Sequence, residues 1–496
     1  MAEMELLDTN FRYGWNTDSP SILISDDELT LADNAVIMNR GGIRKRYGTS
    51  RLNPTSFNAY VEQVIEWPRD DGTFVLLAVL NDGNEINLCR ITEEGEAVPV
   101  QNLNSTRIAY FFLFDKFYFI DPGTEYYVYN GTACNPVTPA LESDNNLEPI
   151  KRCKYAIYHS KSNRIFFAGD SEEQPAVYYS EYNNPEYVKA ISVVYPTRAD
   201  GPVKGLAVLM DALIVGYRFS NWVWMGIDPA YDAIWERLPT SHGPLNGDCF
   251  ALTTDSLSMV SEGGIFALSP AILGLAMEAE PGSGYIMNIA KDKVLNVLHS
   301  ITAPEKVKTV FNSDTGEFFI AYCDDDSGRN NKILTFDWEL RAFSRYEGLK
   351  VNDFCLRQNG ELLLATENYI LKLDKDSQED IGPDGIRKVY NFHIKTAKYN
   401  FGSVIVKKRV SRIFVIFRNF GELHELKVRL IVDDEPKQEF VINGDNSGKD
   451  VLVFRQKTSH VGNNFQLEIE NNQYSEVEIY GIGFYYSYVD ADGVKI

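Results

Sequence analysis

The stretch Phe74–Leu80, FVLLAVL, is a short apolar strand pattern that returns six more times along the chain. The later copies are FYFI (117–120), RIFFA (164–168), ALIVG (212–216), LSMV (257–260), EFFIA (317–321) and ELLLA (361–365). Their starts lie 43, 47, 48, 45, 60 and 44 residues apart. A period near 45 residues is typical of a β-propeller, whose small antiparallel sheets bury their faces against their neighbours. The spacing predicts an all-β protein with a propeller of about seven blades over residues 51–375.

The 60-residue interval contains an apolar pattern of a different kind. Between residues 271 and 303, apolar residues including Ile286, Ile289, Val294 and Val297 recur at helical spacing, and Pro304 ends the pattern. We predict one amphipathic helix inserted between two blades. Such an insertion either offers a contact face or fills a gap in the ring, and the pattern does not favour one role over the other.

The chain changes character on both sides of the repeats. Residues 376–385 are polar with Gly and Pro, which predicts a linker. Residues 386–496 hold about seven alternating strands, such as Leu426, Val428, Leu430 and Val432, which favours a β-sandwich. Residues 1–50 have little periodicity and are interpreted as an N-terminal arm that serves assembly.

Composition narrows the classes of function. The chain has 496 residues, a formal net charge of −22 and a pI near 4.8, which disfavours a nucleic-acid-binding surface. No apolar run approaches the length of a membrane span, and no signal peptide is visible at the N-terminus. The six cysteines are scattered without a CxxC pair, so reduced core thiols are expected. These features predict synthesis and retention in a cytoplasm.

The sequence contains no motif that predicts an enzyme, a cofactor site or a metal site. The six histidines are too dispersed for an HxH or HExxH motif, and neither a GxSxG elbow nor a P-loop occurs. The acidic run Asp324–Asp326 is interpreted as a solvated turn. The stretch 312–319, NSDTGEFF, is close to the Asp-box of sialidase-type propellers, SxDxGxxW, which is a structural hairpin. One imperfect copy supports a propeller and says little about glycoside hydrolysis.

Two short basic stretches remain, at Arg44-Lys45-Arg46 and at 407–409. Each is more typical of an exposed strand end or a protein contact than of a DNA site. We assign Arg44, Lys45 and Arg46 as a candidate subunit contact, with a solvated basic turn as the alternative.

The N-terminal segment resembles that of the tail nozzle proteins of short-tailed bacteriophages, the group of tail tubular protein B and related tail-hub propellers. The likeness comprises Asn16, the turn 18–20 (DSP), the acidic stretch 24–29, the pair Asn34-Ala35, and the basic patch 41–48 that ends in Gly48. Looser likenesses are VYYSEYNNPEYV (177–188), GDCFALTTDSLSMVSEGGIFALS (247–269) and FDWELRAFSRYEG (336–348).

This resemblance implies a structural virion protein of a phage tail, made in the host cytoplasm. It implies a homo-hexameric ring that forms a channel for genome passage during ejection, without sequence-specific DNA binding. Its partners would be the adaptor, the portal-proximal ring and the tail fibres. The alternative is a glycan-binding or sialidase-like propeller with a lectin-like sandwich, for which export and several Asp-boxes would be expected.

Overall fold

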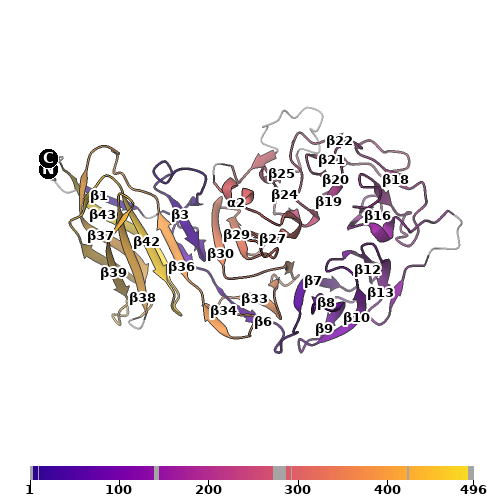
Figure 1. Cartoon of the computed structure of the whole chain (residues 1–496), viewed down its shortest axis with the longest axis horizontal. Coiled ribbons are helices and arrows are strands. Elements are labelled where there is room, and N and C mark those ends of the chain that lie inside the picture. Colours follow the sequence, from indigo (N-terminus) through magenta and orange to yellow (C-terminus); the bar gives the residue numbers. More distant parts are fainter. Residues whose placement is uncertain are drawn as a thin grey trace.

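The computed structural model describes residues 4–8, 10–138, 144–271, 286–291, 293–421 and 424–489. Within these residues almost all regular structure is strand, arranged in many small sheets (Figure 1), so the prediction of an all-β protein is confirmed. The described helical segments are α2 (Leu295–His299) and three 3₁₀ turns (Ile150–Arg152, Gly247–Cys249 and Pro304–Lys306).

Each of the seven apolar repeat strands is the second strand of a four-stranded antiparallel unit. These strands are apolar because they lie between two paired neighbours and are largely buried. The first four units are β7–β10 (Tyr60–Pro68, Phe74–Asn81, Ile86–Ile91, Ala97–Leu103), β11–β14 (Ala109–Leu113, Lys116–Asp121, Glu125–Tyr129, Cys134–Pro136), β15–β18 (Tyr155–His159, Arg164–Ala168, Val177–Tyr179, Val193–Val194) and β19–β22 (Val203–Leu209, Ala212–Tyr217, Ser220–Trp224, Glu236–Arg237).

The last three units differ in how their outer strands are supplied. They are β23–β26 (Phe250–Leu252, Leu257–Ser261, Gly264–Leu268, Ile286–Asn288), β27–β30 (Lys308–Asn312, Glu317–Tyr322, Lys332–Asp337, Ala342–Glu347) and β31–β33 (Asp353–Leu356, Leu362–Ala365, Ile370–Asp374) with β6 (Gly48–Arg51). The seventh unit therefore takes its fourth strand from the N-terminal segment. We call these seven units the repeat region.

The units follow one another in a cyclic order. The first strand of each unit contacts the first strand of the next, from β11 through β15, β19, β23 and β27 to β31, and β31 contacts β7. Gln63 on β7 exchanges side-chain hydrogen bonds with the backbone of Ile108, immediately before β11 (3.3 and 3.1 Å). Aromatic side chains fill the spaces between units; the Phe166 and Trp224 rings, for example, lie 5.4 Å apart. Each such buried ring contributes roughly 1.5–3 kcal/mol relative to an exposed one.

The C-terminal residues form two sheets that share one core, which we call the C-terminal sheet pair. Its eight strands after the repeat region are β36 (Phe392–Thr396), β37 (Lys408–Arg418), β38 (Glu425–Val432), β39 (Glu435–Asn443), β40 (Val451–Lys457), β41 (Val461–Gly462), β42 (Phe465–Asn471) and β43 (Glu478–Tyr488). The alternating residues Val428 and Leu430 are buried in one core cluster with Ile413 and Val415 of β37. Alternation therefore identified the inward faces correctly.

The N-terminal segment is integrated into both regions, although its sequence suggested a separate arm. Its strands are β1 (Met4–Asp8), β2 (Gly14–Trp15), β3 (Glu28–Asp33), β4 (Ala35–Ile37), β5 (Ile43–Lys45) and β6. β1 and β5 pair with β43, while β2 and β3 lie between β30 and β36. The result is a ten-stranded sheet that runs from the sixth repeat unit into the C-terminal sheet pair (Figure 1).

Two further expectations need correction. The predicted helix over 271–303 falls partly on residues 272–285 and 292, which lie outside the described residues; the described part contains strand β26 and the short helix α2. Ile286 and Asn288 form that strand because they pair with β25. The predicted linker includes β34 (Glu379–Ile381), which pairs with β35 (Arg387–Val389).

Candidate functional site at the joint between the two regions

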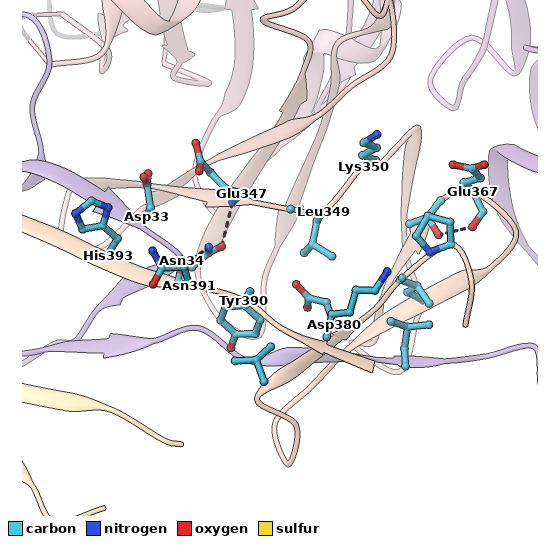
Figure 2. Close-up of a pocket in the computed structure, with 18 residues that line it drawn as sticks. Asp33, Asn34, Glu347, Leu349, Lys350, Glu367, Asp380, Tyr390, Asn391 and His393 are labelled. Atoms are coloured by element: carbon cyan, nitrogen blue, oxygen red, sulfur yellow. Dashed lines mark hydrogen bonds between the residues drawn. The ribbon is translucent and has the colours of Figure 1, made fainter. Parts of the chain in front are cut away.

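A cleft of about 530 Å³ lies where the repeat region meets the C-terminal sheet pair. Figure 2 shows its polar side chains, which come from the N-terminal segment, the end of β30, the turn between β32 and β33, and the segment that follows β33. The residues that matter most are Asp33, Asn34, Glu347, Asp380, Tyr390 and His393. Leu349, Leu371 and Ile381 add apolar surface to the same cleft.

Asn34 joins three parts of the molecule. Its backbone has a φ of 55°, a left-handed conformation that Asn tolerates better than most residues. Its side-chain oxygen accepts hydrogen bonds from Arg46 Nε (2.8 Å) and from the backbone amide of Glu347 (3.0 Å), while Nδ2 donates to the carbonyl of Asn391 (2.7 Å). Its own amide donates to the carbonyl of Arg345 (2.7 Å). One side chain thus ties β30, the N-terminal segment and the entry to β36 together.

Arg46 forms a second buried link. Its side chain is fully buried and pairs with Asp380 on β34, with one hydrogen bond of 2.9 Å from Nη1 to Oδ1. The guanidinium also lies 3.7 Å from the centroid of the Tyr390 ring, whose hydroxyl donates to the carbonyl of Arg46. Bidentate pairing offsets the cost of burying a guanidinium, so the charge is stable only while Asp380 remains opposite it.

The three basic residues assigned as a candidate subunit contact differ in their surroundings. Lys45 is buried and donates to Asn471 (3.1 Å) and to the carbonyl of Gln473 (2.7 Å), so both Lys45 and Arg46 already have partners within the chain. Arg44 is half-buried and stacks over the Tyr47 ring at 4.0 Å. A subunit contact through this patch stays a prediction, and Arg44 is its most accessible member.

Burial shifts the pKa values of two charged side chains at this joint, Lys45 and Asp33. Burial and the neighbouring Arg46 lower the pKa of Lys45 to about 8, against an opposing effect of Asp380. Burial also raises the pKa of the Asp33 carboxyl, although Arg345 binds it through two hydrogen bonds of 2.8 and 2.9 Å. Both shifts reflect groups held out of water by the contact between the two regions.

Charged side chains alternate across the ten-stranded sheet beside the cleft. Next to the Arg345–Asp33 pair lies His393, whose Nε2 is 2.9 Å from Glu468 and 3.4 Å from Glu470. Beyond them, Arg429 pairs with Glu468 and Glu439. The possible ligand atoms of His393, Glu468 and Glu470 lie within 4.8 Å of one another. Sequence spacing gives no sign of this proximity, because His393 is far from the two glutamates along the chain. Because Arg429 and His393 already satisfy these carboxylates, we interpret the group as a cross-strand ion-pair network.

A separate charged cluster lies at the first strands of several repeat units. Arg107, just before β11, pairs with Asp248, just before β23, and lies 3.9 Å from Asp353 at the start of β31. Lys308 on β27 pairs with the same two aspartates, at 2.7 and 3.9 Å. Burial raises the pKa of Asp353 to about 6, against the lowering effect of Arg107. The cluster connects four different repeat units through charged side chains.

The stretch close to an Asp-box forms the expected hairpin. β27 ends at Asn312, whose side-chain oxygen accepts from the amide of Asp314 (3.0 Å), and Gly316 turns the chain with a φ of 70°. Phe319 is buried at the position that Trp takes in the Asp-box pattern.

Two residues of the joint that sequence reasoning left without a role are Asn34 and Asp380. Asn34 was visible within the Asn-Ala pair, whereas Asp380 lies in a polar stretch with no local signal.

No protein-family model and no curated protein matches the chain. Solved structures that resemble it include PorZ, a surface component of the type-IX secretion system of Porphyromonas gingivalis, at 13% identity and a TM-score of 0.40, covering 73% of this chain and 44% of PorZ. The computationally designed protein Ika8 matches at 9% identity and a TM-score of 0.37, covering 65% of this chain and 98% of Ika8. No helix among the described residues is long and apolar enough to span a membrane.

An exo-β-1,3-galactanase from Phanerochaete chrysosporium also matches, at 10% identity and a TM-score of 0.27, covering 86% of this chain and all of the galactanase. The prediction that this chain is not an enzyme is wrong, because a glycosidase is among the similar structures. At this identity and TM-score the likeness assigns no activity to this chain.

Proposed function

We propose that the chain is a structural protein of a bacteriophage tail, a nozzle or hub subunit that forms a ring-shaped channel for genome passage. The observation that carries the proposal is the position of the residues with the family resemblance. Asn34-Ala35 and the basic patch that ends in Gly48 are the residues that join the repeat region to the C-terminal sheet pair. A likeness at the joint fits a protein whose function depends on a fixed arrangement of its parts.

The proposed fold is a seven-bladed propeller joined to a β-sandwich. The cyclic contacts between the first strands and the return of β31 to β7 support a closed ring of seven units. The shared core of the C-terminal sheets supports a sandwich that is completed by strands of the N-terminal segment.

A channel for DNA would lie between copies of the chain. Arg107 and Asp248 belong to the second and fifth units, so their ion pair crosses the middle of the proposed propeller. With Lys308 and Asp353 it forms a charged cluster at the proposed axis of a single chain. The net charge of −22 suits the wall of a channel that repels phosphate instead of binding it.

The proposed assembly is a homo-hexamer located in the tail of the virion. Its partners would be the adaptor, the portal-proximal ring and the tail fibres. Arg44, the half-buried and most accessible member of the basic patch, is our candidate for a contact between subunits.

Light scattering of the purified protein, alone and with the tail proteins of the same phage, tests the proposal. We expect a ring of about six chains of 56.2 kDa each, or a monomer that forms such a ring on its partners. A stable monomer that ignores tail proteins but binds or cleaves glycans would contradict it and favour the glycan-binding alternative.

A further inference from the structure

The C-terminal sheet pair ends in two free edges on the same side. Among the described strands, β39 pairs only with β38, and β40 pairs only with β37, so each ends its sheet. The Phe440 and Phe454 rings stack between these two edge strands, 5.4 Å apart and inclined by 13°. The two edges therefore lie next to each other, at the end of the molecule away from the repeat region (Figure 1).

These edges carry exposed apolar side chains beside exposed charged ones, Glu439 on β39 and Arg455 and Lys457 on β40. Val441 on β39 is 42% exposed, and Val451 and Val453 on β40 are 47% and 49% exposed. Native edge strands are commonly protected by Pro, Lys or a bulge. β39 has this protection only in its first half, at Pro436 and Lys437, and β40 has it only at its last residue, Lys457. The segments 439–443 and 451–455 are left open for pairing.

The two open segments are complementary to each other. β39 and β40 are joined by the short segment 444–450 and run in opposite directions, so the Phe440–Phe454 stack fixes their relative height. Counted from that stack in an antiparallel register, Val441 would face Val453 and Glu439 would face Arg455. A two-fold axis parallel to the strands would place β39 of one copy beside β40 of another in this same antiparallel register.

We propose that this edge is a self-association surface, on which β39 of one chain pairs with β40 of a second copy, and reciprocally. The contact would continue both sheets across the dimer and bring the Val441 and Val453 side chains together twice. It would also place Glu439, which pairs with Arg429 of its own chain, opposite Arg455 of the other copy, and cross-strand pairs of opposite charge are favourable. In this register Lys437 would face Lys457 next to Pro436, so we place the end of the pairing at Glu439 and Arg455. The contact is two-fold and does not depend on the proposed ring.

Charge reversal tests the proposal most directly. Sedimentation velocity over a range of concentrations should show reversible self-association of the intact chain. Glu439→Arg and Arg455→Glu should each weaken it about tenfold, because each substitution places like charges opposite one another at two positions of the dimer. The double variant Glu439→Arg/Arg455→Glu should restore association, since opposite charges then face each other again.

A valine substitution provides a matched control. Val453→Lys should abolish association, whereas Val98→Lys, at a 41% exposed valine on the edge strand β10 of the first repeat unit, should leave it unchanged. Circular dichroism checks that each variant is folded. A monomer at all concentrations, or an assembly whose mass responds to none of these variants, would overturn the proposal. A six-chain ring insensitive to them would support the proposed function while overturning this contact.

Discussion

At the scale of single residues, the joint depends on buried polar groups whose partners come from distant parts of the sequence. Arg46 reaches Asp380, and Lys45 reaches Asn471 and Gln473. Such groups are stable only as complete sets, because an isolated charge in the same place would have neither water nor a partner. The N-terminal basic patch is therefore a structural element of the joint as well as a candidate contact.

The Arg46→Ala substitution should lower the free energy of unfolding by about 3–5 kcal/mol, because it leaves the Asp380 carboxylate buried without its partner. Arg44→Ala, two positions away and half-buried, should cost less than about 1 kcal/mol. Urea denaturation of both variants measures the difference. Equal effects would contradict the structural role of Arg46.

The Asp353→Asn substitution should change how stability depends on pH. Because the folded pKa of about 6 exceeds the ordinary value of 3.8, the folded wild type binds more protons than the unfolded chain between these values. Its stability from this group is greatest below pH 3.8 and is lost as the pH rises through 6. The variant should therefore gain stability relative to the wild type from pH 4 to pH 7, by up to about 3 kcal/mol. A constant difference over this range, measured by thermal unfolding, would contradict the buried environment of Asp353.

At the scale of elements, strand β6 completes the seventh repeat unit from the other end of the chain. Gly48 pairs with Asp374 of β33, and its amide donates to the carbonyl of Ser377 (2.7 Å). A Cβ atom at Gly48 would collide with the backbone of Glu379 on β34. The glycine is thus required by the close approach of three backbone segments.

The Gly48→Ala substitution should destabilise the protein by about 1–3 kcal/mol, since neither β33 nor β34 can move without losing its own pairing. Ser50→Ala on the same strand is the matched control, because the Ser50 hydroxyl is buried without a hydrogen-bond partner in the described structure and its loss should be neutral. Differential scanning calorimetry compares the two. A harmless Gly48→Ala would mean that β6 does not lie against β34 as described.

At the scale of the whole molecule, the predictable features were those with a local signal. The seven apolar strands marked seven four-stranded units, of which the sixth is part of the ten-stranded sheet, because each strand is buried between two paired neighbours. Val428 and Leu430 marked a half-buried strand by alternation. The ten-stranded sheet has no such signal, because Asp33 pairs with His393 and Arg345 across more than 300 residues. The helix predicted over 271–303 was wrong in its described part, because helical spacing over a short stretch also suits a strand such as β26 followed by one helical turn.

The continuous sheet predicts that the two regions behave as one body. Asn34→Leu should break the three side-chain hydrogen bonds that hold β30, Arg46 and Asn391 together, and should place a branched residue at a φ of 55°. Limited proteolysis of this variant should cleave the connecting segment 375–391 and release a C-terminal fragment at least tenfold faster than in the wild type, as local opening costs less. Identical cleavage rates would contradict the role of Asn34 as the link between the regions.

The pairing of β1 with β43 also governs when the protein can fold during synthesis. Residues 4–8 pair with residues 482–486, so β1 cannot pair until β43 has been synthesised. β5 and β6 wait similarly for β43 and β33. Contacts this distant in sequence slow folding and leave strand edges exposed in the nascent chain. Translation products that end before β43 should therefore aggregate instead of yielding a stable fragment, and the nascent chain is expected to benefit from chaperones until β43 has left the ribosome.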